Sequence, residues 1–347
     1  MERQTIDSQR GEIEFRKKLS VQHVTGETLL SEYYGKDEHD QILLERMQKT
    51  ERDMRELQKR ETLSPFIELG AERCQRSLVM TNDFGATGFA VDISFHQLRT
   101  AAHFAKKFNK PRLPYRVCCD INNLPFRSGS VPFVFCYEFL HHFPSPRPII
   151  QQAHRVLSSG VFVFNEEPFR RPKLVLFRQS QKLYAEGNLR KSRTRRFLES
   201  FFTEEFCDER EHGIIENDDI SLAHWNESLS VFESREVVAY SLGDRLRSRL
   251  DRGVSLKNLP NLVMGGGIRG ICRKKQDSRK QVSDLTELLA CPDCLEAKGP
   301  QTDPPPLERQ SGKLQCGVCS SQFPVVDDIP ILLPTRLRRE LYPEFLT

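Results

Sequence analysis

The chain has 347 residues, of which 38% are hydrophobic and 29% are charged, and its formal net charge is +4. This composition is typical of a soluble globular protein, and the length suggests two domains or one domain with an appendage. No apolar run approaches the roughly 20 residues that a membrane-spanning helix needs. The charged start, MERQTIDSQRGEIEFRKK, predicts neither a secretory signal nor a membrane anchor. We therefore expect a cytoplasmic protein without membrane contact, whose ten cysteines are reduced thiols.

A helical segment is predicted over residues 1–60, ahead of the first strand. Within it, apolar residues recur at helical spacing between Ile42 and Leu57, with acidic and basic residues in between. This helix either packs on the sheet or covers a ligand cleft, and packing is favoured. Tyr33 and Tyr34 lie just upstream, where the leading segment would cover a ligand.

The rest of the chain is organised around residues 66–94, FIELGAERCQRSLVMTNDFGATGFAVDIS. An apolar run ends at Gly70, a predicted helix follows, and a second apolar run ends at Asp92. Gly70 lets the backbone come close to a ligand. Asp92 follows it by 22 residues, near the roughly 20 expected for a carboxylate that binds ribose hydroxyls. The pattern indicates a βαβ unit for an adenosine-bearing cofactor.

Strands and helices continue to alternate after this unit. Such elements are predicted for residues 95–108, 115–119, 131–137, 149–157, 161–164, 235–241 and 262–273. Right-handed crossovers between them build a parallel sheet with helices on both faces, and ligands of such sheets bind at the carboxyl ends of the strands.

A specific resemblance is carried by residues 120–168, DINNLPFRSGSVPFVFCYEFLHHFPSPRPIIQQAHRVLSSGVFVFNEEP. The order of its acid, Leu-Pro-Phe turn, apolar strand, Leu-His-His segment and Arg-Val-Leu helix end resembles class I S-adenosylmethionine-dependent methyltransferases of the type 11 group. GGGIRGICRKK, at residues 265–275, is similar to the family's final antiparallel strand. The resemblance implies an α/β domain over residues 61–275, with a Rossmann-like, doubly wound, mostly parallel seven-stranded sheet and S-adenosylmethionine as cofactor.

The resemblance also implies which residues contact this cofactor. They are Glu68 and Gly70 beside its methionine part, Asp92 and Ile93 beside the ribose, Asp120 and Ile121 beside the adenine, and Tyr137 near the reactive methyl. The chemistry agrees, because carboxylates accept hydrogen bonds from hydroxyl and amino groups and isoleucine packs on a ring face. No general base is assigned, since methyl transfer from a sulfonium can be catalysed largely by positioning.

The loop after Gly70 departs from the family at two positions. Glu72 and Cys74 stand where the second and third glycines would be. A β-carbon there would crowd the ligand, and Glu72 would repel the cofactor's carboxylate. Two alternatives follow: the loop is displaced and binding is weak, or the site has lost its cofactor.

Other candidates have both a functional and a structural interpretation. Glu138, Glu166 and Glu167 follow strands over the same cleft, where each could orient a nucleophile. His141 and His142 could act as a base or bind a metal, but packing and capping are favoured.

The stretch between the fifth and sixth predicted strands is harder to interpret. Its basic run from Arg190 to Arg196 could bind RNA, although a solvated helix face or loop is favoured. The only tryptophan, Trp225, could stack on a planar substrate, but a core position is favoured.

A second unit is predicted at the C-terminal end, where a polar linker at residues 276–286 leads into a small domain at residues 287–335. Its two CxxC pairs are separated by 21 residues and comprise Cys291, Cys294, Cys316 and Cys319. Four thiolates at this spacing close a tetrahedral zinc site and leave no open position, so the Zn²⁺ is expected to be structural. A redox dithiol is the less favoured alternative.

The segments LLACPDC, LQCGVC and FPVVDDIPILL resemble a small zinc-ribbon-like family that activates tRNA and protein methyltransferases as a separate subunit. The resemblance implies a fusion of that module to its catalytic partner. In the family, the module packs on a methyltransferase by adding a strand or covering apolar surface. We also expect it to offer a surface for a protein partner.

The two resemblances together predict S-adenosylmethionine-dependent methyl transfer. At the end of the fourth strand, CYEF stands in place of the Asn/Asp-Pro-Pro-aromatic motif of enzymes that methylate amides or bases, which favours a small acceptor over RNA. The alternative is a catalytically degenerate scaffold that acts as a binding or interaction protein, and Glu72 and Cys74 are its motive.

Overall fold

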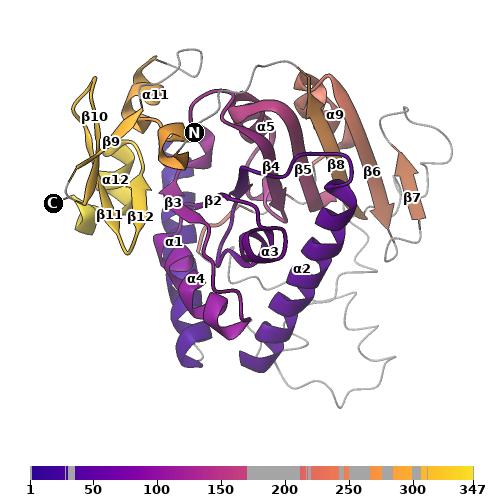
Figure 1. Cartoon of the computed structure of the whole chain (residues 1–347), viewed down its shortest axis with the longest axis horizontal. Coiled ribbons are helices and arrows are strands. Elements are labelled where there is room, and N and C mark those ends of the chain that lie inside the picture. The colour runs from indigo at the N-terminus through magenta and orange to yellow at the C-terminus, as the bar shows by residue number, and fades with distance from the viewer. Residues whose placement is uncertain are drawn as a thin grey trace.

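The computed structural model describes residues 2–27, 29, 36–169, 212–215, 217, 220–241, 246–249, 266–275, 284–298, 306–310 and 312–346. Its described strands form one sheet in the order β7-β6-β8-β5-β4-β1-β2-β3-β12-β11-β10-β9 (Figure 1). The predicted α/β fold is confirmed, and the C-terminal module is part of the same sheet.

Five parallel strands form the centre of this sheet. They are β1 (Phe66–Leu69), β2 (Gly88–Asp92), β3 (Tyr115–Cys119), β4 (Val131–Tyr137) and β5 (Leu157–Phe169). The helices between them are α3 (Gln75–Asp83), α4 (Phe95–Lys107) and α5 (Arg147–Val156). The strands are almost wholly buried, as expected for a sheet covered on both faces.

Antiparallel strands continue the sheet beyond β5. They are β6 (Ser234–Ser241), β7 (Leu246–Arg249) and β8 (Gly266–Lys274). Strand β8 lies between β5 and β6 and is antiparallel to both, as predicted for the family's final strand. Strand β7, which pairs with β6, was not predicted. Residues 262–265 of the predicted last strand lie outside the described residues.

The C-terminal module extends the other end of the sheet. Its elements are η7 (Leu285–Leu288), α11 (Pro292–Lys298), β9 (Leu307–Gln310), β10 (Lys313–Cys316), β11 (Gln322–Val326), β12 (Ile329–Leu332), α12 (Thr335–Leu341) and η8 (Pro343–Phe345). Strand β12 pairs in parallel with β3, with Ile331 opposite Cys118 and Leu332 opposite Cys119. The module thereby covers the edge that β3 would otherwise expose, as the resemblance implied.

Two N-terminal helices, α1 (Glu2–Thr25) and α2 (Lys36–Leu57), flank the sheet (Figure 1). Helix α1 packs against α4 and α12, whereas α2 packs against α3. The predicted amphipathic helix corresponds to α2, and Tyr33 and Tyr34 lie outside the described residues. In the part of the chain that the structure describes, no helix is long and apolar enough to cross a membrane.

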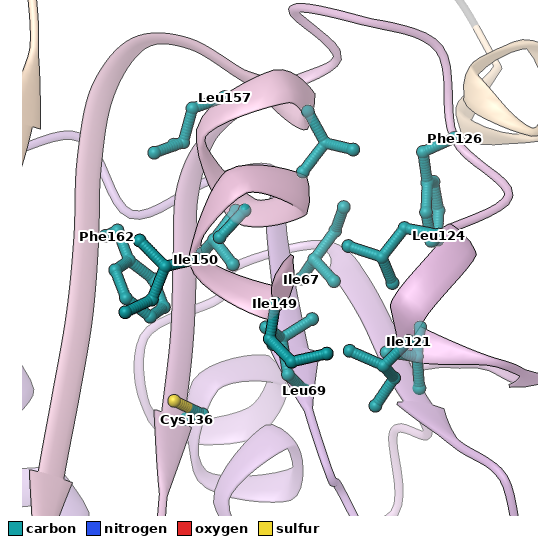
Figure 2. Close-up of a cluster of buried hydrophobic side chains, with 14 of the residues drawn as sticks. Ile67, Leu69, Ile121, Leu124, Phe126, Cys136, Ile149, Ile150, Leu157 and Phe162 are labelled. Carbon is teal, nitrogen blue, oxygen red and sulfur yellow. The ribbon is translucent and has the colours of Figure 1, made fainter. Parts of the chain in front are cut away.

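The core lies on both faces of the central strands. On one face, Ile67 and Leu69 pack against Ile149 and Ile150 of α5 (Figure 2). Helix α9 (Leu222–Ser228) continues this face, and its Trp225 is fully buried in the core, as expected.

The opposite face holds every second residue of β4, because strand side chains alternate. Phe133, Phe135 and Tyr137 pack there against Met54 and Leu57 of α2. Short helical turns complete the described elements: η1 (Ile121–Asn123), η2 (Leu140–His142) and η5 (Leu229–Val231).

Candidate cofactor and acceptor site

The loop between β1 and α3 keeps a glycine-like backbone at three alternate positions. The φ angles are 65° at Gly70, 46° at Glu72 and 61° at Cys74, all in the left-handed region that favours glycine. At Gly70 a β-carbon would lie 2.2 Å from the side chain of Phe139, so this position requires glycine. Glu72 and Cys74 thus have a left-handed backbone conformation although neither is a glycine.

The carboxylate of Glu72 is turned toward arginines. Its Oε1 lies 2.8 Å from Arg16 of α1, and its Oε2 lies 3.4 Å from Arg73 and 3.8 Å from Arg46 of α2. Burial alone would raise the pKa of Glu72, but these guanidinium groups hold it well below its ordinary value. The loop is thus tied to both N-terminal helices through one ionised side chain.

Asp92, at the end of β2, is held against the same loop. Its Oδ2 accepts a hydrogen bond of 2.9 Å from the backbone N–H of Glu72, and its Oδ1 accepts one of 2.8 Å from Ser94. Burial raises the pKa of Asp92 to about 6, although both backbone donors favour the carboxylate. The neighbouring carbonyl of Ile93 accepts a 2.8 Å hydrogen bond from the hydroxyl of Tyr342, in the C-terminal module.

Asp120 lies at the end of β3, where it begins η1. Its Oδ1 accepts hydrogen bonds from the backbone and side chain of Asn122 at 3.0 and 2.9 Å, and from Gln9 of α1 at 3.3 Å. Burial raises the pKa of Asp120. Ile121 is buried in the core beneath it.

Helix α1 therefore contacts both the predicted adenine site and the loop predicted to hold the methionine part of the cofactor. Gln9 meets Asp120 and Arg16 meets Glu72. These two residues are seven positions apart, or about 10 Å along a helix. The predicted helix, α2, is thus joined by α1, which lies along the carboxyl edge of the sheet.

Glu68 is buried within β1 and faces the start of α3. Its Oε2 accepts hydrogen bonds from the backbone N–H of Ser77, at 2.9 Å, and from the Ser77 hydroxyl. Burial raises the pKa of Glu68 to about 7, against the opposing effects of Arg76 and Ser77. The predicted cofactor residue fixes α3 relative to β1, just behind the loop.

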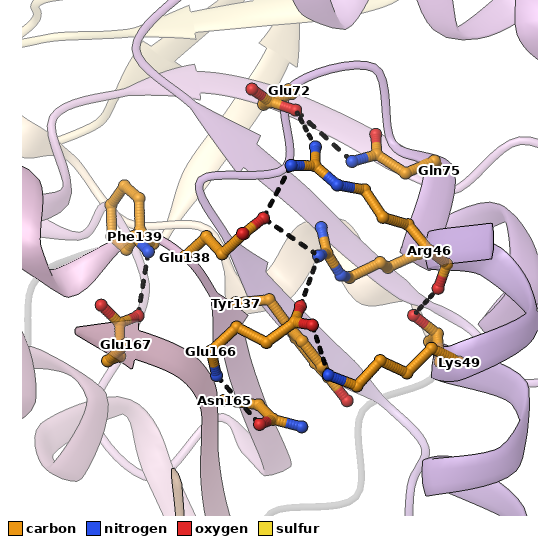
Figure 3. Close-up of polar contacts among 12 residues, drawn as sticks. Arg46, Lys49, Glu72, Gln75, Tyr137, Glu138, Phe139, Asn165, Glu166 and Glu167 are labelled. Atoms are coloured by element: carbon orange, nitrogen blue, oxygen red, sulfur yellow. Dashed lines mark hydrogen bonds and ion pairs between the residues drawn. The ribbon is translucent and has the colours of Figure 1, made fainter. Parts of the chain in front are cut away.

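The ends of β4 and β5 present a second group of polar side chains, shown in Figure 3. The Tyr137 hydroxyl donates to Asp53 of α2 at 3.2 Å, and Asn165 donates to the same carboxylate oxygen at 3.1 Å. Burial raises the pKa of Asp53. Glu138 and Glu166 adopt left-handed φ angles of 49° and 62°, like Glu72.

These acids form an alternating chain of charges with cations of α2 and α3. Arg46 lies 2.7 Å from Glu138 and also reaches Glu72. Arg76 lies 3.4 Å from Glu166 and 4.0 Å from Glu138. Lys49 completes the chain at Glu166, whose pKa is lowered by these cations although burial opposes them. The chain connects the cofactor loop to the ends of β4 and β5.

Glu167 and His141 have a structural role. Glu167 is completely buried and accepts hydrogen bonds from the backbone N–H groups of Phe139, Leu140 and His141, at 2.9 to 3.2 Å. The His141 ring meets the same carboxylate at 3.0 Å. Glu167 therefore caps the turn after β4, in agreement with the packing role expected for the histidines.

The four C-terminal cysteines gather at one point. The sulfurs of Cys291 and Cys319 are 3.5 Å apart, those of Cys294 and Cys316 are 3.7 Å apart, and all four lie within 4.8 Å of one another. A tetrahedral site with Zn–S bonds of about 2.3 Å separates its sulfurs by about 3.8 Å. The donor set fits Zn²⁺.

Sequence reasoning missed the residues that come from the N-terminal helices. Gln9 and Arg16 have no local signal, because polar residues on a charged helix normally face solvent. Asp53 had one, since it shares the buried face of α2 with Thr50 and Leu57, where an acid is unusual. The basic run at residues 190–196 lies outside the described residues.

Two family models match the sequence. The model described as a methyltransferase domain matches residues 67–164, and the model described as Trm112p-like protein matches residues 283–328. Both resemblances noted in the sequence are confirmed by these matches. No curated protein matches the sequence.

Solved structures of methyltransferases also resemble this chain. A putative O-methyltransferase from Nostoc punctiforme is 12% identical, with a TM-score of 0.41 over 65% of this chain and 56% of that one. A complex of the Haloferax volcanii Trm112 methyltransferase activator with a putative methyltransferase is 14% identical, with a TM-score of 0.41 over 69% of this chain and 95% of that one. Phosphoethanolamine N-methyltransferase 2 from Haemonchus contortus is 15% identical, with a TM-score of 0.43 over 66% of this chain and 53% of that one. The chain thus spans little more than half the length of the first and third, and these likenesses identify no acceptor.

Proposed function

We propose that this chain, which joins a methyltransferase domain to a Trm112p-like domain, transfers the methyl group of S-adenosylmethionine to a small acceptor molecule. The observation that carries the proposal is the loop with its left-handed residues Gly70, Glu72 and Cys74, in which the backbone N–H of Glu72 donates to Asp92. A second carboxylate, Asp120, lies at the end of the next strand. Together they supply the backbone and the acceptors that a nucleoside needs.

Residues at the carboxyl edge of the sheet would each contact a different part of the cofactor. Asp92 and Ile93 would hold the ribose, Asp120 and Ile121 the adenine, and the loop between Glu68 and α3 the methionine part. When bound, the cofactor would supply a methyl group on a sulfonium that is already a good leaving group. The residues of this chain then need to bind, orient and exclude water, so no general base is required.

Tyr137 is the residue we place nearest the methyl group. Its hydroxyl is fixed by Asp53, and its ring lies 4.5 Å from the guanidinium of Arg76. Burial raises the pKa of Tyr137 well above its ordinary value, so the hydroxyl stays protonated and acts as an oriented donor or as a wall. We assign it positioning, not proton transfer.

Glu72 need not repel the cofactor. Its carboxylate is directed to Arg16 and Arg46, which neutralise it. Helix α1 would act as a cover, because the contact between Gln9 and Asp120 must open or shift when adenine enters. This arrangement supports weakened binding over complete loss of the cofactor.

A small acceptor is favoured by the residues at the end of β4 and in the turn that follows it. Residues 136–139, Cys-Tyr-Glu-Phe, lack the paired prolines with which amide and base methyltransferases hold a planar nitrogen. An RNA acceptor would rest on the basic run at residues 190–196, which the structure does not describe. We place the enzyme in the cytoplasm, where the four clustered thiols would stay reduced and able to bind Zn²⁺.

The C-terminal module would bind a structural Zn²⁺ through its four cysteines and stabilise the edge of the sheet. Its remaining surface is the site we propose for a protein partner. The rival function is a scaffold without catalysis, and one observation favours it: α1 already satisfies Glu72 and Asp120 through Arg16 and Gln9. In that case α1 would permanently block the cofactor site.

Calorimetric titration with S-adenosylmethionine tests the proposal. We expect saturable binding by the zinc-loaded protein and its loss in Asp92→Ala, while Glu56→Ala, on an exposed part of α2, binds like the wild type. Zinc content and circular dichroism confirm that each variant is folded. Absence of binding in folded wild-type protein would support the scaffold.

A further inference from the structure

Arg76 is a buried cation whose hydrogen-bonding capacity is not filled. Its side chain is 5% exposed, and its Nε has no hydrogen-bond partner among the described residues. The carboxylate oxygens within reach lie 3.4 Å away, on Glu166, and 4.0 Å away, on Glu138. A buried guanidinium usually holds a carboxylate or phosphate by two short parallel hydrogen bonds. Arg76 therefore has the capacity to bind an anion at shorter distances than those of Glu166 and Glu138.

Two further cations reach the same place from α2. Arg46 and Lys49 lie about one turn apart and are 32% and 33% exposed. Arg46 contacts Glu138 and Lys49 contacts Glu166, so both point toward the acids that Arg76 touches. Two further acids lie nearby: Asp53 is engaged by Tyr137 and Asn165, and Glu72 lies 3.8 Å from Arg46. Two rigid helices thus direct three cations to the end of β4.

Glu138 is the group that a ligand would displace. Its side chain is 42% exposed, and its one close charged contact is Arg46 at 2.7 Å. Glu166, by contrast, is 23% exposed and paired with both Lys49 and Arg76. Glu138 can swing toward solvent and leave Arg46 and Arg76 to an incoming oxyanion.

We infer that Arg76, Arg46 and Lys49 form an oxyanion-binding site for the acceptor, which would carry a carboxylate or phosphate group. Glu138 occupies this site in the absence of the ligand. The assignment to the acceptor rests on the proposed function, because the site adjoins Tyr137, where we place the methyl group. The oxyanion would anchor one end of the acceptor and leave its nucleophile beside Tyr137.

The test uses the full-length, zinc-loaded protein and inorganic phosphate as the probe, titrated by calorimetry at constant ionic strength. We expect saturable phosphate binding that Arg76→Gln and Arg46→Gln each weaken by about tenfold or more. Glu138→Gln removes the internal competitor and should tighten phosphate binding several-fold. Arg55→Gln, an exposed residue of the same α2, should change nothing. Equal binding by wild type and Arg76→Gln would overturn the inference.

Further measurements separate this inference from the proposed function. Arg76→Lys keeps the charge without the planar fork, so it should fold like the wild type and still bind phosphate more weakly. Phosphate should bind equally well with and without saturating S-adenosylhomocysteine; competition would assign Arg76 to the cofactor's carboxylate instead and contradict us. If S-adenosylhomocysteine does not bind at all, the proposed function fails, but the phosphate titration still reports on the site. Succinate in place of phosphate then distinguishes a carboxylate from a phosphate ligand.

Discussion

The cofactor loop and the cysteine cluster relate to their sequence motifs in opposite ways. In the cluster, the cysteines of the motif are themselves the metal ligands. Four thiolates at CxxC spacing must converge for Zn²⁺ to bind, and their sulfurs do converge. In the loop, two of three expected glycines are missing, yet Glu72 and Cys74 keep φ angles of 46° and 61°. A motif that supplies ligand atoms cannot be varied, whereas one that supplies a backbone shape can be replaced if other contacts hold that shape.

The contacts that hold the loop come from outside the motif. Glu72 is fixed by Arg16 and Arg46, and its N–H is fixed by Asp92. The strain of a non-glycine residue in the left-handed region, about 1 to 3 kcal/mol, is therefore offset by long-range contacts. The cysteine cluster of the C-terminal module needs no such long-range contacts. The module itself contributes one to the cofactor edge, through the hydrogen bond from Tyr342 to Ile93.

The largest effect is expected on removing the metal. Structural Zn²⁺ sites contribute about 10 to 16 kcal/mol of apparent binding free energy at pH 7, so chelation or Cys294→Ser should unfold the module and expose β3. Thermal unfolding with and without chelator, together with zinc content, measures this. Val318→Ala, which alters a residue between Cys316 and Cys319 that is 60% exposed, is the control. Unchanged melting after complete zinc loss would contradict the structural role.

Glu68 gives the next effect, as a dependence of stability on pH. Its pKa of about 7, raised from 4.5, means that the folded state binds more protons than the unfolded state between these pH values. The free energy of unfolding therefore falls as the pH rises through this window, by up to about 3 kcal/mol. Glu68→Gln should remove most of the slope and be more stable than wild type at pH 8. Asp92, with a pKa of about 6, leaves a smaller slope of the same sign.

Urea titrations of Glu68→Gln and wild type at pH 5 and pH 8 measure this difference. The two proteins should differ little at pH 5 and most at pH 8. An equal difference at both pH values would show that the carboxyl of Glu68 does not titrate in this window.

The loop substitutions should have unequal effects, which sharpens the contrast with the cysteines. Glu72→Gly relieves the backbone but removes the carboxylate that pairs with Arg16, Arg46 and Arg73, so we expect a net loss of about 2 kcal/mol. Cys74→Gly relieves the backbone and loses only a small buried side chain, so its stability should stay within about 1 kcal/mol of wild type. Urea unfolding measures both, and equal losses would contradict the role given to Glu72.

The smallest effect is expected where the two regions meet. The Tyr342 hydroxyl donates to the carbonyl of Ile93 and accepts from the N–H of Phe95 at 2.9 Å. Tyr342→Phe should cost about 1 kcal/mol and weaken cofactor binding, because Ile93 follows Asp92. Tyr115→Phe, with a half-exposed ring, should be neutral. Thermal unfolding and calorimetry compare the two, and equal behaviour would mean that the module does not support the cofactor edge.

Local patterns predicted most of the central sheet. Apolar runs such as residues 131–137 and the acids Asp92 and Asp120 mark strands and their ends, because burial on both faces needs continuous apolar residues. The cysteine cluster was predictable for the same reason, since its spacing states its chemistry. Strand β7, with its polar sequence, gave no such signal.

Long-range contacts were beyond local patterns. Nothing in the sequence near Gln9 or Arg16 says that α1 reaches Asp120 and Glu72. The partners of Arg76 are Tyr137, Glu138 and Glu166, at the ends of β4 and β5, and only the fold brings them to α3. The predicted domain limits at residues 61–275 and 287–335, and the roles of the cofactor residues, remain predictions.

Our central claim is that the conformation of the loop, and not the identity of its glycines, preserves cofactor binding. The most direct measurement is calorimetric titration of S-adenosylmethionine into wild type and into the double variant Glu72→Gly/Cys74→Gly. We predict that both bind and that the variant gains at most about tenfold, or 1.4 kcal/mol. No binding by wild type and clear binding by the variant would show that Glu72 and Cys74 close the site.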